Sequence, residues 1–320
     1  MKTKTILPTL LIILFSSMSC NSNIRKLKKE SEGGDAEAQY NLAVEYYIGE
    51  EIKANHELAF KWMEKSAQQG HIEAQRELGH LYHYGEGVVA DTIKALHWMK
   101  MSAEQGDASS QFNVALMYKE GKGGITQDLQ EAFNWCIKSA EQEHAKAQFN
   151  LSFMYFDGEG TAQDKEEAFN WMKKCADLGT KEAQFVIGVD YENGIGTEID
   201  KEAAFNWYEK AAKQGHKDAQ YTLGILYNNG NIVETDKEEA FYWFKESAEQ
   251  EHPEAQFHVS DMYRIGEGVK TDKEQAFYWA KKSVENGNID VQYNLGLMHD
   301  LGQGTKQDDS QAFYWYKKSA

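Results

Sequence analysis

The sequence predicts an all-α solenoid of eight helical hairpins that repeat about every 36 residues. Every tryptophan stands at the same point of the period, and an alanine lies three residues before each of them, from Ala59 to Ala312. Successive tryptophans are 36 residues apart except for one gap of 37, and they are Trp62, Trp98, Trp135, Trp171, Trp207, Trp243, Trp279 and Trp315. A fixed period of this length is typical of an array in which each unit packs only on its neighbours.

Composition agrees with a folded array and narrows the class of partner. The chain has 320 residues, more than one compact core usually holds, and only two prolines, Pro8 and Pro253, so helices can run uninterrupted. The net charge is −17, and residues 31–320 carry 28 basic against 50 acidic side chains. A strongly acidic surface repels phosphate, so nucleic acid is not an expected partner.

The second helix of each hairpin has the clearest pattern. Ala59, Trp62, Met63, Ser66 and Ala67 fall at helical spacing on one face. An Asn or Asp precedes this helix in every repeat, where its side-chain oxygen can accept a free backbone N–H of the first turn. In five repeats an acid or Gln follows three residues later, which predicts a capping box. The predicted N-cap residues are Asn55, Asp91, Asp128, Asp164, Asp200, Asp236, Asp272 and Asp308.

The first helix carries an aliphatic residue followed by a residue no larger than Ser, as in Leu78-Gly79 and Leu151-Ser152. Glycine inside a helix costs about 1 kcal/mol relative to alanine, so its presence predicts that another helix crosses closely there. A glycine loop follows, and the extra residue of the 37-residue repeat lies in it, around Gly123-Gly124. Loops accept insertions because little packs on them.

The first nineteen residues differ from the rest. Lys2 and Lys4 precede an apolar run of about ten residues and then small residues, so residues 1–19 are predicted to be an export signal. The sequence Ser17-Met18-Ser19-Cys20 resembles a bacterial lipobox, which implies a lipid anchor on Cys20 and a place in the cell envelope, at the outer membrane or surface. The alternatives are cleavage to a soluble secreted or periplasmic protein, or an anchor helix that is retained.

Both ends of the array depart from the repeat. Residues 20–35 are predicted to be a tether, in which Ile24, Leu27 and Ser31 suggest a half-helix over residues 23–33 that caps the first repeat; a wholly flexible tether is the alternative. At the other end the chain stops at Ala320 without a polar cap, which would expose an apolar face. A truncated or frayed last helix is favoured over self-association through this end.

The segment "AQFNLSFMYFDGEGTAQDKEEAFNWMKKCADLG" resembles the Sel1-like repeat family, a relative of the tetratricopeptide repeat with a longer unit. The resemblance covers residues 36–320. It includes the Ala-Gln opening, the small residue before Tyr, the Gly-x-Gly loop and the Ala-x-x-Trp helix. It implies a right-handed superhelix with the first helices on its concave side, and adaptor or scaffold work in place of catalysis.

The sequence contains few patterns that indicate catalysis or metal binding. No glycine-rich phosphate loop follows a strand and no serine stands in a nucleophile elbow, so neither an enzyme nor a cofactor is expected. His80 and His83 could touch one metal ion, but a pair of histidines without further ligands is a weak signal, and no metal site is expected. Cys136 and Cys175 lie at different points of different repeats and are expected to be buried thiols.

A partner-binding surface is predicted from what the repeats leave free to vary. Two positions of the first helix, three residues apart and therefore on one face, change widely between repeats. By the resemblance, this stripe faces the concave groove. An aromatic anchor with a polar surround is typical of interfaces. The alternative is a solvent-facing stripe in which Phe153 and Phe156 only pack. The predicted binding residues are His80, His83, Lys119, Phe149, Phe153, Phe156, Asp261 and Arg264.

The sequence therefore favours an exported, lipid-anchored adaptor that binds a protein or peptide in its groove. The resemblance extends this to envelope scaffolding or host-cell interaction, in which bacterial relatives serve. Two other classes stay open. One is a cell-envelope enzyme that acts on wall-derived substrate, and the other is a structural scaffold that assembles with copies of itself through the C-terminal repeat.

Overall fold

A computed structural model of the chain describes residues 20–320. The predicted export signal, residues 1–19, lies outside the described residues, and so does the side chain of Cys20. Within residues 20–320 the structure has 17 α-helices, one short 3₁₀ turn and no strand. The predicted all-α solenoid class is confirmed.

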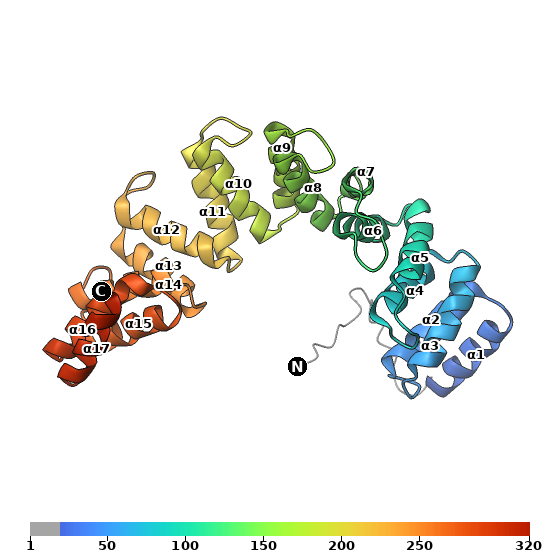
Figure 1. Ribbon diagram of the computed structural model, residues 1–320, viewed down its shortest axis with the longest axis horizontal. Helices are drawn as coiled ribbons and strands as arrows, with labels where there is room; N and C mark the ends of the chain where they lie inside the picture. The colour runs from blue at the N-terminus through green and yellow to red at the C-terminus, as the bar shows by residue number, and fades with distance from the viewer. Residues whose placement is uncertain (1–19) are drawn as a thin grey trace. The chain divides into compact units, whose positions relative to one another are not determined.

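The described residues divide into two compact units, the first ending at His144 and the second running from Ala145 to Ala320. Figure 1 shows the helices of each unit. In each unit the helices run in chain order and each packs on the next. The helices of unit 1 are α1 (Cys20–Glu32), α2 (Ala36–Ile48), α3 (His56–Gln68), α4 (Ile72–Tyr84), α5 (Thr92–Glu104), α6 (Ala108–Glu120) and α7 (Leu129–Ala140). The helices of unit 2 are α8 (Ala145–Asp157), α9 (Lys165–Asp177), α10 (Lys181–Asn193), α11 (Lys201–Lys213), α12 (Lys217–Asn229), α13 (Lys237–Glu249), α14 (Pro253–Ile265), α15 (Lys273–Glu285), η1 (Ile289–Val291), α16 (Gln292–Leu301) and α17 (Asp309–Ser319).

The predicted caps of the second helices are confirmed in all eight repeats, from Asn55 to Asp308. Each side chain accepts a hydrogen bond from a backbone N–H of the first turn. The capping box does not form as predicted. The backbone N–H of Asp164, which such a box would pair with Glu167, donates to the Tyr155 carbonyl at 2.8 Å instead. This bond closes the loop onto the first helix, and an equivalent bond is present in every repeat.

The first helices have caps that the sequence did not identify. His71, His216 and His252 follow the interhelix turn, and the Nδ1 atom of each accepts a hydrogen bond from a backbone N–H of the helix that follows. Their rings also stack on an aromatic side chain of the preceding first helix, as His71 does on Tyr40 at 4.8 Å between centroids. These histidines are therefore structural.

Buried polar side chains connect successive hairpins. The Gln of each Ala-Gln opening turns back to a carbonyl of the preceding helix, as Gln75 does to the Ala67 carbonyl at 3.1 Å. In most repeats it also accepts from an amide of the next hairpin, as in the bond from Gln105 to Gln75 at 2.7 Å. A buried Gln that makes several hydrogen bonds satisfies backbone groups that stacking would otherwise leave unpaired.

The small residues of the first helices mark close helix crossings, as predicted. A Cβ atom added to Gly188 would lie 2.5 Å from the Tyr208 ring, and one added to Gly224 would lie 2.5 Å from the Phe244 ring. Both rings belong to the second helix of the same hairpin and are almost fully buried. The missing side chain therefore makes room for a ring.

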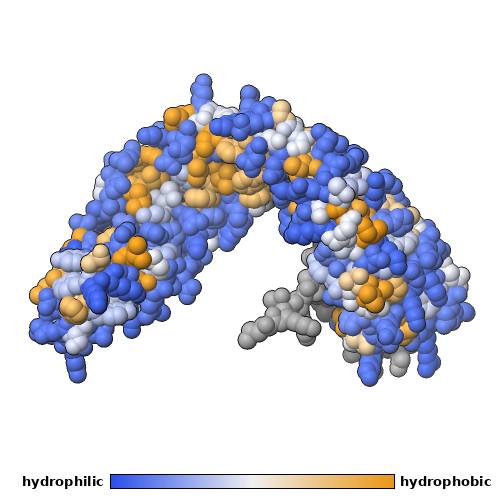
Figure 2. All heavy atoms as spheres, viewed as in Figure 1, coloured by the Kyte–Doolittle hydropathy of each residue, from blue (hydrophilic) through white to orange (hydrophobic). Residues whose placement is uncertain are grey.

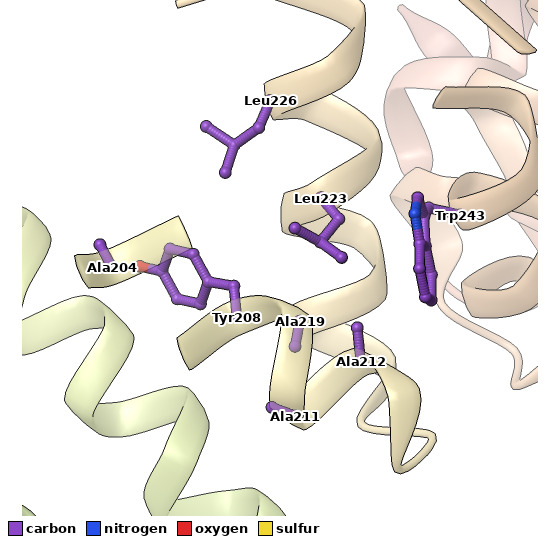
Figure 3. Close-up of a cluster of buried hydrophobic side chains, with 8 residues drawn as sticks. All are labelled: Ala204, Tyr208, Ala211, Ala212, Ala219, Leu223, Leu226 and Trp243. Atoms are coloured by element: carbon purple, nitrogen blue, oxygen red, sulfur yellow. The ribbon is translucent and has the colours of Figure 1, made fainter. Parts of the chain in front are cut away.

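Three tryptophans pack on clusters that two successive hairpins share. Trp243 of α13 packs on the cluster formed by α11 and α12, where Tyr208 and Leu223 are buried. In Figure 3 the α12 helix lies between Tyr208 and Trp243. Trp207 packs in the same way on the cluster of α9 and α10, and Trp279 on that of α13 and α14, so each contacts the last helix of the preceding hairpin and the first helix of its own. The strict spacing of the tryptophans thus comes from contacts between repeats, since no hairpin buries its own apolar face alone.

The ends of the described array also form helices. α1 packs on α2, and Gln39 donates to the Ser31 carbonyl at 3.0 Å, just as Gln75 donates to the helix before its own. α17 leaves Phe313 69% and Tyr314 52% exposed. None of the helices within residues 20–320 combines the length and the apolar character that a membrane crossing requires.

Candidate functional site

The eight predicted binding residues fall in both units. They differ in exposure and in the contacts that they already form with neighbouring side chains. His80, His83 and Lys119 lie on α4 and α6 of unit 1, and the other five lie on α8 and α14 of unit 2.

The unit 1 residues lie among polar groups. His80 is half-buried, and burial together with the nearby charges of Arg76 and His83 lowers its pKa to about 4. His83 is exposed and meets the edge of Tyr84, with ring centroids 4.8 Å apart. Lys119 is half-buried near Cys136; burial raises the pKa of that thiol to about 12, and the lysine opposes the rise. Both Cys136 and Cys175 are buried, as predicted.

An ion-pair cluster next to His80 accounts for most of the charge on α4. The Arg76 guanidinium is 3.0 Å from a carboxylate oxygen of Glu77 and 2.9 Å from Asp107, and all three side chains are largely buried. One oxygen of Glu77 is left without a partner. The cluster is closed mainly on itself, so Arg76 has little charge to offer a ligand.

Asp261 and Arg264 also serve each other. The arginine Nε donates to the Asp261 carboxylate at 2.9 Å within α14, and both side chains are exposed by more than a third. An exposed pair three residues apart on one helix contributes little to stability. It also reduces what either residue presents to a partner.

The three phenylalanines of α8 differ in exposure. Phe149 is partly buried and packs against the cluster of α9 and α10 that contains Met172 and Ile187. Phe153 meets Phe149 edge to face, with centroids 5.2 Å apart, and is 39% exposed. Phe156 is half-buried. Phe153 is therefore the most accessible of the three rings, and Phe149 and Phe156 are each accessible in part.

Phe153 and Phe156 line a cavity of about 130 Å³ between α8, α9 and α10. Phe169 and Met172 of α9 form its apolar wall, and Asp190 of α10 adds a carboxylate. On the face shown in Figure 2, apolar residues gather over the stretch of unit 2 that Figure 1 labels α8 to α10. We refer to this place as the α8–α10 cavity. It brings together two predicted residues with one that the sequence analysis did not single out.

Asp190 is the unexpected member of the site. It is only 9% exposed, yet among the described residues its carboxylate has no hydrogen-bond or ion-pair partner. Burial alone raises its pKa to about 6. A signal was present in the sequence, because the equivalent position is apolar in all the other repeats except the first, which has Glu45. Those apolar residues are Leu81, Met117, Met154, Leu226, Met262 and Met298.

Two further groups define the electrostatics of the cavity. The Lys165 ammonium lies 5.6 Å from the centroid of the Phe156 ring, at the exposed start of α9. Glu192, two residues after Asp190, accepts a hydrogen bond from the Tyr208 hydroxyl at 2.6 Å. Glu192 is therefore already engaged, whereas Asp190 is not.

The described residues offer little to metal-dependent or acid–base chemistry. Within residues 20–320 no group of three or more His, Cys, Asp or Glu side chains is arranged to hold a metal ion. The alternative of an envelope enzyme would be favoured by acids that converge in a pocket. The α8–α10 cavity holds one carboxylate, Asp190, and a larger, open hollow of about 560 Å³ at the start of α11 is lined by Glu198, Asp200 and Glu202, of which Asp200 caps the helix.

Comparisons with known proteins give a consistent result. The family model described as Sel1 repeat matches residues 36–71, 72–107, 108–144, 145–180, 181–216, 217–252, 253–288 and 289–320. The 37-residue match, residues 108–144, contains the Gly123-Gly124 insertion predicted from the spacing. No curated protein matched the sequence.

Two solved structures are similar over almost the whole chain. One is a protective antigen present in uropathogenic Escherichia coli strains and displaying an SLR fold; it is 34% identical over 93% of this chain, with a TM-score of 0.88. This chain spans 64% of the length of that antigen. The other is a Sel1 repeat protein from Oxalobacter formigenes, 28% identical over 98% of this chain and 93% of its own, with a TM-score of 0.75.

Proposed function

The chain belongs to the Sel1 repeat family, whose members generally mediate protein–protein interactions, and we propose that it is an adaptor that binds a protein or peptide at the α8–α10 cavity. The observation that carries the proposal is the combination, in one place, of partly exposed aromatic rings and a buried carboxylate without a partner. Aromatic anchors in a desolvated pocket concentrate binding energy at protein interfaces.

The proposal includes a location. The basic and apolar start of the chain and the lipobox-like residues before Cys20 support export and a lipid anchor, which would hold the adaptor at a membrane surface of the cell envelope. The similar Escherichia coli protein is described as a protective antigen, a property that agrees with a place accessible to a host. Acyl-chain mass spectrometry of the mature protein and of a Cys20→Ala variant tests this part directly.

Partner capture tests the adaptor function. The chain from residue 21 onward is crosslinked to envelope extract and, separately, to host-cell lysate, beside a Phe153→Ala/Phe156→Ala variant. We expect one dominant partner that the double variant loses. Tyr242→Ala is the control, since Tyr242 is a 50% exposed aromatic residue on α13 that does not line the cavity, and it should keep the partner.

The same variants separate binding from folding. Phe153 is 39% exposed, so its truncation should leave the helical circular dichroism unchanged while capture is lost. If the double variant unfolds, the phenylalanines are core residues and the site is wrongly placed. If no partner is captured from either source, self-assembly becomes the better hypothesis, and Phe313 and Tyr314 on α17 would be the residues to test first.

A further inference from the structure

We propose that the α8–α10 cavity accepts one basic side chain, a lysine or arginine of the partner, with its aliphatic stem against Phe153 and Phe156 and its cationic head on the Asp190 carboxylate. This inference rests on the proposed adaptor function and names the chemistry that the partner must bring to that site.

The size of the cavity favours a single side chain. Its volume is about 130 Å³, whereas sites for whole small molecules usually measure about 300–1,000 Å³. The walls contributed by Phe153, Phe169 and Met172 are apolar. A long side chain with an apolar stem and a polar tip suits such a place, because lysine and arginine routinely bury their methylene groups and keep the charge at the end.

The carboxylate decides the charge of the occupant. Asp190 is 9% exposed, and within the part of the chain that the structure describes its carboxylate keeps only the solvent of the cavity as a contact. Such a largely buried charge is costly, and an opposite charge with hydrogen-bond donors relieves that cost. In six other repeats a leucine or methionine fills this position with apolar atoms. Asp190 therefore replaces apolar packing with a carboxylate. An anionic occupant would be repelled by Asp190 and by a chain whose net charge is −17.

One aromatic ring of the cavity already has a cation beside it. The Lys165 ammonium lines the cavity and lies 5.6 Å from the centroid of the Phe156 ring, so this ring already faces a positive charge and the cationic head of the occupant must lie at Asp190 instead. Among the described residues Lys165 and Asp190 do not form an ion pair, and burial is the cause that raises the pKa of that carboxylate. The acidic surface of the chain would also attract a basic segment over distance.

The charged and titratable groups that face Asp190 give a pH dependence. They are Lys165 from α9, which lines the cavity, and Tyr208 from α11, whose hydroxyl donates to Glu192 of α10. Asp190 must be ionised to hold a cation. Since burial places its pKa at about 6 in the empty site, binding should be weak near pH 5 and reach its full strength near pH 7.

A phage library of random linear peptides, selected on the chain from residue 21 onward, is the probe. We expect the selected peptides to share a lysine or arginine next to apolar residues. Replacement of that residue by norleucine, which keeps the stem and removes the charge, should weaken binding roughly tenfold or more. Asp190→Asn should cause a loss of the same size. Asp190→Met, which installs the residue that Met154 provides in the preceding repeat, should abolish binding while the fold is kept.

Glu45→Gln is the matched control, because Glu45 occupies in α2 the position of Asp190 in α10, and it should leave binding unchanged. Peptides that depend on Phe153 and Phe156 but not on a basic residue or on Asp190 would overturn this inference and leave the adaptor function standing. Selection of no peptide at all would count against the adaptor function, and this inference would fall with it.

Discussion

The helices α4 and α8 occupy equivalent places in their hairpins, yet they use the same two surface positions in opposite ways. α4 carries His80 and His83, where α8 carries Phe153 and Phe156. Beside His80, the Arg76, Glu77 and Asp107 side chains form a buried ion-pair cluster. Beside Phe153, the rings border an open cavity whose one carboxylate, Asp190, is unpaired.

The difference teaches that polarity alone does not mark a binding site. Arg76 and Asp107 replace the aromatic residue and the histidine that stack on each other in several other repeats, such as Phe185 and His216. One interaction between repeats has been exchanged for another, and the result is structural. At the α8–α10 cavity the Asp190 carboxylate has no hydrogen-bond or ion-pair partner among the described residues. A binding partner that supplies one can therefore gain free energy there.

Removal of Arg76 should have the largest effect on stability. Arg76→Ala leaves Glu77 and Asp107, both largely buried, without their cation, and the loss of one partner from a buried pair costs about 3–5 kcal/mol. Urea unfolding monitored by circular dichroism measures the change in the free energy of unfolding.

Replacement of the ion-pair cluster by the residues of another repeat tests whether the cluster only takes the place of an aromatic stack. The triple variant Arg76→Phe, Glu77→Asn and Asp107→His installs the residues of the next repeat, which has Phe112, Asn113 and His144 at these positions. The ring centroids of Phe112 and His144 are 5.2 Å apart. It should recover most of the stability lost in Arg76→Ala. If it stays as unstable as that variant, the cluster does more than replace an aromatic stack.

Asp190 should lower the free energy of unfolding, whereas Arg76 raises it. Burial raises the pKa of Asp190 from 3.8 to about 6, so the folded state binds the proton more tightly than the unfolded state does. Stability should therefore fall as pH rises from about 4 to about 6, and Asp190→Met should be more stable than the natural chain by about 2–3 kcal/mol at pH 7. Urea titrations across this pH range measure it, and equal stabilities at pH 7 would show that the carboxylate is paired.

The contribution of His80 to stability should change with pH in the opposite direction to that of Asp190. Its pKa is lowered to about 4, mainly by burial, so the folded state disfavours the protonated ring. Stability is then lost as pH falls below the unfolded value of 6.5, by about 1–2 kcal/mol near pH 5. His80→Phe, which copies Phe153, should remove this dependence. NMR of the His80 ring should show no titration between pH 8 and about pH 5.

The pair on α14 should have the smallest effect. Arg264→Ala removes an exposed ion pair with Asp261, and such pairs contribute about 0.5 kcal/mol or less. The unfolding midpoint in urea should therefore hardly move, and partner capture should be unchanged. A clear loss of capture would return Asp261 and Arg264 to the binding site.

Much of the fold could be predicted from the sequence because its determinants are local or strictly periodic. The Asn or Asp caps act within three residues, and the spacing of Ala, Trp and the small residues shows which face of each helix is buried. The candidate site could be predicted only in part. Phe153 and Phe156 were found as variable surface positions, whereas Asp190 was overlooked because it stands at a position that packing fills in most other repeats.

The sequence by itself therefore determined the repeat, its period, its caps and the family to which the chain belongs. Only the tertiary structure decided which polar side chains are paired. The partners of Arg76 and Gln75 include Asp107 and Gln105, each about one repeat away, and the walls around Asp190 come from three different helices. Periodicity states which way a side chain faces, but whether it meets a partner or an empty space depends on the hairpin stacked against it.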